Sequence, residues 1–276
     1  MNILLFGTGG TPNSTPPPNS SVAGIARLAE LGLDCMEMEF VRGVHMNQDT
    51  ALQVAATAKR LNIRLTAHAP YFINLHSADL EKIEGSKYHI IQTARIAVPC
   101  GVESIVFHAG SYEGDSPENA YPVVKKNLAE VLARLKKEGI TIRIRPEVLG
   151  KSAQFGTIDE VLRLSSELEG VLPTIDFAHW HARTGKYNTY KEFAEILEQI
   201  DKKLGRSALD NMHMHISGIK YGAKGELKHL NFEESDFNYK ELVKVLKDYR
   251  VKGFAICESP SLEEDAQRLK DTYNEL

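Results

Sequence analysis

Eight short apolar runs alternate with eight longer amphipathic stretches along this chain, and that alternation limits its possible folds more than any other feature. The short runs are predicted strands, at residues 3–6, 35–40, 64–68, 104–108, 141–147, 171–176, 212–216 and 253–258. The stretches with helical spacing are predicted helices, at residues 22–31, 51–61, 83–100, 121–137, 158–168, 190–204, 239–249 and 262–273. Strict alternation of strand and helix predicts a parallel sheet that is covered by helices.

The number of units and their length favour a closed barrel over an open sheet. The chain has 276 residues, so each strand–helix unit has roughly 34 residues, which suits a strand, a helix and two short loops. An open dinucleotide-binding sheet is disfavoured because Gly7-Thr8-Gly9-Gly10 lacks the third glycine of a GxGxxG fingerprint. We therefore expect an α/β fold, a single (β/α)8 TIM barrel over residues 1–276, with the proline-rich residues 11–20 as a stiff first βα loop.

Composition and charge exclude several classes of protein. Hydrophobic residues make up 42% and charged residues 25%, which is typical of a globular chain and not of a disordered chain or a coiled coil. No apolar run approaches the ~18 residues of a membrane span, and we expect no membrane association. Three cysteines at unrelated spacings favour neither a disulfide framework nor a Cys-type zinc finger, so the reducing cytoplasm is the expected compartment. The net charge of −4 argues against binding a polyanion by bulk charge, although local basic loops or bound cations can do so.

Six of the predicted strands end in a side chain of a type that binds metals. TIM-barrel active sites lie at the carboxyl ends of the strands. Here those ends carry His68, His108, Glu147, Asp176, His215 and Glu258. Polar groups that converge on a barrel mouth must satisfy one another or hold something, so we predict a metal centre. Three histidines with three carboxylates suit zinc, manganese or iron, and a carboxylate can bridge two such ions ~3.5–4 Å apart.

Other histidines are weaker candidates for the same centre. His179 lies three residues after the end of the sixth strand, and His229 lies in the long loop after the seventh. His181 is a further candidate, and His213 shares a face with the histidine that ends its strand, so it is interpreted as filling the barrel interior. The histidines without a partner pattern are interpreted as structural, and they are His45, His76 and His89.

Charged residues also alternate within two of the strands. Arg143, Arg145 and Glu147 share one face of the fifth strand, and Glu37 and Glu39 share one face of the second. If these faces point into the barrel, their charges must pair. We therefore predict that Glu37 or Glu39 contacts Arg145 inside the barrel mouth.

The strand ends lie within short segments that span most of the chain. These are Ala67-His68-Ala69-Pro70-Tyr71, Phe107-His108-Ala109-Gly110-Ser111, Pro146-Glu147 with Gly150-Lys151, Ile175-Asp176-Phe177-Ala178-His179, Met214-His215-Ile216-Ser217 and Glu258-Ser259-Pro260. As a set they resemble the endonuclease IV family, the zinc-dependent apurinic/apyrimidinic endonucleases of the xylose isomerase-like barrel superfamily. The resemblance implies a TIM barrel that holds three zinc ions and cuts DNA at abasic sites.

The resemblance also implies which residues bind each ion. The first set is His68, His108 and Glu147, the second is the bridging Glu147 with Asp176, His215 and Glu258, and the third is His179 and His229 with an Asp two residues before His229. That last position is Leu227 in this chain, which cannot bind a metal. Glu226, His181 or a water is the candidate replacement, and a weak or empty third site is the alternative. We therefore expect two or three Zn2+ ions, with Mn2+ as the alternative metal.

The resemblance implies roles in catalysis and DNA binding as well. The expected catalytic residues are Glu147, Glu258 and Asp176. The expected DNA-binding residues are Arg42, Tyr71 and Phe72. The two aromatic residues occupy the place of a wedge that opens the duplex, and the arginine fills the vacated stack. The family's glycine-rich stretch after the last histidine is replaced here by Glu233, Glu234 and Asp236, which would repel phosphate.

The predicted function is hydrolysis of the phosphodiester 5′ to abasic sites in double-stranded DNA, as in base excision repair, with no obligate protein partner. One alternative is a single-metal sugar isomerase or epimerase of the same superfamily, with one Mn2+ or Mg2+ and carboxylates as proton shuttles. Another is a homologue that binds metal or DNA without turnover. His68 and His108 together favour the nuclease, because the single-metal isomerase does not need them.

Overall fold

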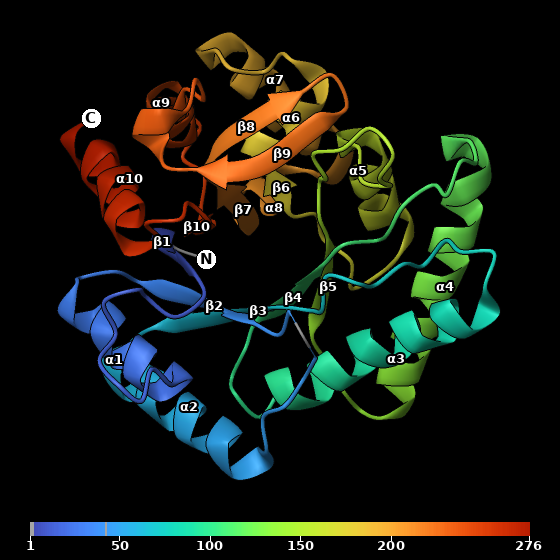
Figure 1. Ribbon diagram of the computed structural model, residues 1–276, viewed down its shortest axis with the longest axis horizontal. Helices are drawn as coiled ribbons and strands as arrows, with labels where there is room; N and C mark the ends of the chain where they lie inside the picture. Colours follow the sequence, from blue (N-terminus) through green and yellow to red (C-terminus); the bar gives the residue numbers. More distant parts are fainter. Residues whose placement is uncertain (1–2, 42) are drawn as a thin grey trace.

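The computed structural model describes residues 3–41 and 43–276. Its central sheet consists of β1 (Leu4–Gly9), β2 (Cys35–Glu39), β3 (Arg64–His68), β4 (Ser104–Phe107), β5 (Arg143–Pro146), β6 (Ile175–Asp176), β7 (Met212–Ile216) and β10 (Gly253–Cys257). The strands pair in the order β5-β4-β3-β2-β1-β10-β7-β6, and each of these pairings is parallel. Figure 1 shows the sheet curling around a central axis.

Backbone contacts between the two edges of the sheet close the barrel. Ile144 and Glu147 on one edge form parallel bridges with Val171 and Thr174, which precede β6. The Thr174 N–H donates to the carbonyl oxygen of Pro146 at 3.0 Å. The predicted α/β fold with a (β/α)8 TIM barrel is therefore confirmed.

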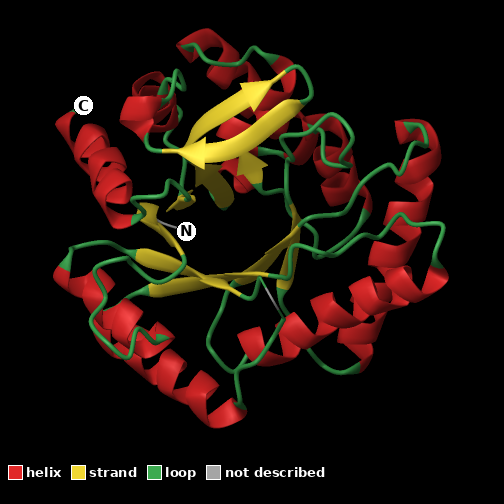
Figure 2. Cartoon of the chain, in the orientation of Figure 1, coloured by secondary structure: helices red, strands yellow, loops and turns green. Residues whose placement is uncertain are grey.

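Helices surround the barrel on its outer face, as Figure 2 shows. The helices that follow predicted positions are α1 (Ser21–Glu30), α2 (Gln48–Leu61), α3 (Leu80–Ala97), α4 (Pro117–Lys137), α5 (Ile158–Glu167), α7 (Tyr190–Leu204), α9 (Tyr239–Asp248) and α10 (Glu263–Glu275). Side-chain caps define their first turns: Thr157 and Thr189 each form a capping box with the glutamate three residues later. The apolar faces of the helices pack on the outer face of the sheet and form one large hydrophobic core.

The structure adds elements that the sequence pattern does not predict. These are the helices α6 (Phe177–Thr184) and α8 (Arg206–Leu209), the antiparallel hairpin of β8 (Gly218–Gly222) and β9 (Gly225–Leu230), and the 3-10 helix η1 (Phe232–Glu234). The hairpin lacks an apolar run because much of it is exposed, and α6 is too short to show helical periodicity. Both the hairpin and α6 lie at the carboxyl end of the barrel, beside its mouth (Figure 1).

Arg145 does not make the predicted contact with Glu37 or Glu39. Its guanidinium is buried and donates to the carbonyl oxygen of Pro173 at 2.9 Å, and to the backbone and side-chain oxygens of Asn211 at 3.0 and 3.2 Å. Pro173 and Asn211 precede β6 and β7, so Arg145 points toward the amino-terminal end of the barrel, away from the mouth. The prediction was wrong because Glu37 has two imidazoles as its partners instead.

Two further observations concern the chain as a whole. Cys35, Cys100 and Cys257 are all buried and unpaired. Across residues 3–41 and 43–276, no helix combines the length and the apolar character that crossing a membrane requires.

Candidate metal centre

Parallel strands of similar register bring the predicted strand-end side chains together at the barrel mouth. Glu147 lies at the centre, with one carboxylate oxygen 3.1 Å from Nε2 of both His68 and His108. Its other oxygen lies 3.2 Å from Nδ1 of His215, and that nitrogen lies 3.4 Å from Oε2 of Glu258. The chain separates Glu147 from His68 by 79 residues and from His215 by 68. The barrel fold, rather than any local motif, therefore builds this cluster.

Among the groups of donor atoms compact enough to surround one ion, three consist entirely of predicted metal ligands. These three are His68 with His108 and Glu147, Glu147 with Asp176, His215 and Glu258, and Asp176 with His179 and His229, and within each group the donor atoms lie within 4.8 Å of one another. Glu147 and Asp176 belong to two groups each, as bridging carboxylates do. Asp176 Oδ2 is buried and makes no hydrogen bond with the described residues, although His179 Nδ1 lies 3.1 Å from it. Nitrogen and carboxylate donors with an unsatisfied buried oxygen fit divalent metal ions of the zinc type.

The pKa values at the centre depend on carboxylates and imidazoles that are buried close together. Burial raises the pKa of the Glu147 carboxyl, but the charges of His215 and His108 and hydrogen bonds from the histidines outweigh it and hold that pKa well below its usual value. Burial opposes protonation of His68, yet the hydrogen bond to Glu147 and the charge of Glu39 raise its pKa to about 9. Burial, together with the charges of His68 and His179, lowers the pKa of His108 although Glu147 raises it. A proton on His68 therefore balances carboxylate charge where a cation would do so.

The sixth strand delivers Asp176 to the mouth and starts α6 with the same residue. Asp176 Oδ1 accepts a hydrogen bond from the backbone N–H of His179 at 2.6 Å, which caps the helix. His179 consequently faces the mouth from the first turn of α6. Burial is the largest influence on its pKa, but the charges of Asp176 and Glu147 outweigh burial and raise that pKa to about 10.

A second cluster, which the sequence analysis did not assign to the site, lies directly beneath the centre. Glu37 is fully buried, with Oε1 2.7 Å from His215 Nε2 and Oε2 2.9 Å from His213 Nε2. Thr66 Oγ1 donates to the same carboxylate at 3.0 Å. A signal for this cluster exists in the sequence, because Glu37 and His213 alternate on their strands with residues at the mouth. His213 does fill the barrel interior, as predicted, and it does so against a charged partner.

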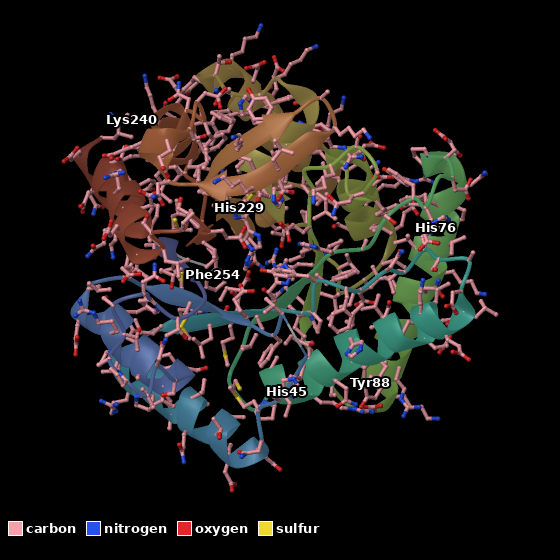
Figure 3. All side chains as sticks on the ribbon, in the orientation of Figure 1. His45, His76, Tyr88, His229, Lys240 and Phe254 are labelled. Carbon is pink, nitrogen blue, oxygen red and sulfur yellow. The ribbon has the colours of Figure 1, made fainter. Side chains whose placement is uncertain are left out.

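The hairpin brings His229 and Glu226 to the mouth. His229 Nε2 lies 3.1 Å from His179 Nε2, and Glu226 Oε2 lies 3.5 Å from the same His179 nitrogen. Leu227 is 61% exposed. His181 is buried elsewhere, with Nδ1 2.8 Å from the Lys186 carbonyl oxygen, so Glu226 is the residue near the third group. Figure 3 shows His229 over the middle of the barrel mouth, whereas His45 and His76 lie away from it.

The donor groups open into a cavity of about 450 Å3 at the barrel mouth. Its lining includes Tyr71, His108, Glu147, Lys151, Gln154, His179, Glu226, His229 and Glu258. The Tyr71 ring stacks on His108 with a centroid separation of 5.1 Å, and its hydroxyl donates to Glu39 Oε2 at 3.1 Å. Phe72 is 57% exposed and packs edge-on against His89. Tyr71 is thus exposed at the cavity, Phe72 is exposed next to Tyr71 in the chain, and Arg42 lies outside the described residues.

The acidic segment after His229 has internal partners. Glu233 pairs with Arg268 at 3.0 Å, and Asp236 accepts a hydrogen bond from the Tyr221 hydroxyl at 2.8 Å. Glu234 accepts from the backbone N–H of Asn231 at 3.2 Å. Each of the three acidic side chains therefore has a partner within the protein.

The fold is a parallel (β/α)8 barrel, and imidazoles and carboxylates gather at its mouth. The chain is therefore a TIM barrel with a candidate metal centre. Residues 25–275 match the xylose isomerase-like TIM barrel family, and the chain belongs to that family. An uncharacterized protein of Methanocaldococcus jannaschii is 43% identical over 275 residues, which cover 99% of this chain and 98% of that protein. A probable endonuclease 4 of Mycoplasma pneumoniae is 27% identical over 202 residues, which cover 71% of this chain and 68% of that protein.

Solved structures share the barrel at low sequence identity. Endonuclease IV from Thermus thermophilus superposes with a TM-score of 0.77 at 18% identity, covering 98% of this chain and 100% of that one. A D-tagatose 3-epimerase-like protein superposes with a TM-score of 0.70 at 20% identity, covering 93% of this chain and 94% of that one. Both likenesses concern the fold, so the choice between their chemistries depends on the residues at the mouth.

Proposed function

We propose that this protein is a zinc-dependent phosphodiesterase that hydrolyses DNA on the 5′ side of abasic sites. One observation carries the proposal: His68 and His108 converge on Glu147 within 3.1 Å, beside the separate group of Glu147, Asp176, His215 and Glu258. A carboxylate shared between two donor groups suits a pair of ions that act on one phosphate. Resemblance to the probable endonuclease 4 proteins supports the same substrate.

Each group at the mouth has a role in this proposal. Divalent cations would neutralise the scissile phosphate and lower the pKa of the attacking water. Glu147 holds the two donor groups at a fixed separation, and Asp176 and Glu258 complete the second. Lys151 lines the cavity and supplies a positive charge for a neighbouring phosphate. Tyr71, which lines the cavity, and its exposed neighbour Phe72 are the side chains that would wedge into a duplex with a missing base.

The test is a nicking assay with zinc-loaded protein and a duplex that contains one abasic site. Cleavage 5′ to the lesion, with no cleavage of the matched intact duplex, is the expected result. Glu147→Gln keeps the side-chain volume but removes the shared charge, and it should lower the nicking rate at least about 100-fold. Tight binding of the abasic duplex without cleavage would instead favour a homologue that binds without turnover.

A sugar isomerase or epimerase with one metal ion is the second candidate. The observation that favours it is the cavity of about 450 Å3, which is in the usual range for small-molecule sites and opens directly onto Glu147 and Glu258. The double variant His68→Ala/His108→Ala separates the two functions. It should abolish nicking if the protein is the nuclease, whereas an epimerase that uses only the second donor group would keep its turnover of ketohexoses.

A further inference from the structure

We infer that Glu226 completes a third divalent-cation site with His179, His229 and Asp176, and that a β-bulge at Leu227 brings Glu226 to it. The inference rests on the metal-dependent function proposed above, and it adds the ligand that replaces the missing aspartate of the third site and the bulge that places that ligand. The site takes a cation of the zinc type, because its donors are two imidazole nitrogens and two carboxylate oxygens.

The facing imidazoles are the first reason to place a cation here. His179 Nδ1 lies 3.2 Å from the carbonyl oxygen of Val148, and His229 Nδ1 lies 3.1 Å from that of Glu258. A carbonyl oxygen only accepts, so each Nδ1 carries a proton and each Nε2 is the nitrogen that faces the other ring. Those two Nε2 atoms lie 3.1 Å apart. Only one proton fits between two nitrogens at this distance, and a cation bound by both Nε2 atoms would take its place.

The register of the hairpin explains why Glu226 and not Leu227 shares the cavity with His229. Lys220 pairs with Lys228, but the next residue of β8, Tyr221, pairs with Glu226, so Leu227 has no partner on β8. Regular alternation would place positions 227 and 229 on the same face. The extra residue shifts that alternation by one, so position 226 joins His229 at the cavity, while Leu227 is 61% exposed.

Backbone contacts with the loop after β5 hold Glu226 in place. The Glu226 N–H donates to the carbonyl oxygen of Gly150 at 3.0 Å, and the Ser152 N–H donates to that of Lys224 at 3.3 Å. Gly225 adopts a φ of +96°, and a Cβ there would lie 2.1 Å from the Gly150 oxygen. The tip of the hairpin is therefore docked on the loop that carries Lys151.

Gly150 makes room for the Glu226 side chain itself. A Cβ at position 150 would lie 2.7 Å from Glu226 Cβ and 3.1 Å from His179 Cδ2. With no side chain at this position, the Glu226 carboxylate reaches to 3.5 Å from His179 Nε2. The position of the Glu226 carboxylate thus depends on two residues that are not metal ligands, Gly150 and the bulged Leu227.

The experiment counts zinc ions per chain in the full-length protein after exchange into metal-free buffer, with a chelator competition that ranks their affinities. The wild-type protein should hold three ions. Glu226→Gln, which keeps the size of the side chain, should hold two, and so should His229→Ala. Gly150→Ala should weaken the same ion without removing a ligand. Glu233→Gln is the matched control, because it removes an exposed charge from the same region and should leave the count at three.

A double variant tests the bulge separately from the ligand. In Glu226→Gln/Leu227→Asp, a carboxylate stands at the bulged position, which points away from the cavity, so the third ion should stay lost. Recovery of the third ion in this variant would overturn the role of the bulge. A wild-type count of two, or a Glu226→Gln count of three at unchanged affinity, would overturn the site.

Nicking of the abasic duplex, measured on the same samples, keeps the two proposals apart. Three ions without nicking would contradict the proposed function and leave the third site standing. Nicking by a wild-type protein that holds two ions would support the proposed function and contradict the third site. Thermal unfolding monitored by circular dichroism identifies any variant whose loss of zinc reflects misfolding. If Glu226→Gln misfolds, Gly150→Ala provides the second test of the role of Glu226.

Discussion

Glu37 is buried beneath the barrel mouth and affects the mouth by orienting His215. Its carboxylate lies against Nε2 of His215 at 2.7 Å, which leaves Nδ1 of that ring facing Glu147 and Glu258. A carboxylate behind a metal-binding imidazole fixes the ring orientation and makes the ring a stronger ligand. We therefore regard Glu37 as a positioning residue for the second donor group.

The first prediction follows from that position. Glu37→Gln keeps the shape of the side chain but replaces the charge, so zinc affinity should fall by about 10–100-fold while the ion count at saturation stays the same. Competition with a chelator measures the change. Glu30→Gln is the control, because it removes a carboxylate that is exposed on α1 and pairs with Arg27. Equal effects of the two variants would contradict the role given to Glu37.

The second prediction concerns pH. Burial disfavours charge on His68 and His179, but their carboxylate partners raise the pKa values to about 9 and about 10, so both rings are protonated at neutral pH without metal. A cation must displace those protons, and binding therefore strengthens as pH rises toward these values. Apparent zinc affinity should increase between about pH 6.5 and 8 by roughly tenfold per unit for each displaced proton. Zinc-buffered titrations that give a flat profile would show that the rings are neutral in the metal-free protein.

The positions of the candidate ligands at the strand ends could be predicted from the sequence because one rule of barrel geometry places them. His68, His108 and Glu147 each stand at or just after the last residue of a buried strand, so finding the strands finds the residues. Glu37 could not be assigned in this way, because alternation gives the face of a strand but not the partner across the barrel. The predicted pairing with Arg145 failed for that reason.

Among the secondary-structure elements, the hairpin β8–β9 was the hardest to predict and has the largest effect on the site. Its strands are short, polar and bulged, so they carry neither a period of two nor an apolar run. By contrast, β3 and β7 have the predicted bounds, because they are largely buried runs inside the barrel. The sequence therefore predicts the barrel closely but not the elements that cover its mouth.

The third prediction tests how the hairpin docks. Gly225→Ala places a Cβ where it would lie 2.1 Å from the Gly150 oxygen, at a φ of +96° that side chains rarely adopt. The hairpin should move away from the loop after β5 and take Glu226 and His229 with it. Limited proteolysis should then cleave the hairpin faster than in the wild type. Gly222→Ala, whose Cβ would contact only Leu227 at 3.7 Å, is the control and should behave as the wild type.

Across the whole molecule, the candidate metal site and the buried Arg145 lie toward opposite ends of the barrel. The carboxyl end concentrates imidazoles and carboxylates, while at the other end one buried arginine joins segments before β6 and β7 to β5. Burial and the charge of Arg143 lower the pKa of Arg145 to about 9, yet Nη1 and Nη2 donate three hydrogen bonds, while Nε has no partner among the described residues.

The fourth prediction is that Arg145 stabilises the fold without affecting the site. Arg145→Met keeps a long apolar stem but leaves the Pro173 and Asn211 oxygens without their donor, so the free energy of unfolding should fall by about 1–3 kcal/mol. Urea unfolding measures the loss. Arg143→Met, at an exposed position of the same strand, should cost about 0.5 kcal/mol or less. A zinc count below that of the wild type in folded Arg145→Met would contradict the separation of the two ends.

The central claim is that residues distant in the chain hold a pair of cations on either side of one carboxylate. Anomalous diffraction at the zinc absorption edge, from crystals of protein purified with zinc, tests it most directly. The account predicts two strong peaks about 3.5–4 Å apart with Glu147 between them, in addition to the third ion inferred beside His179 and His229. A barrel mouth without a peak, or with one ion that His68 and His108 do not touch, would contradict it.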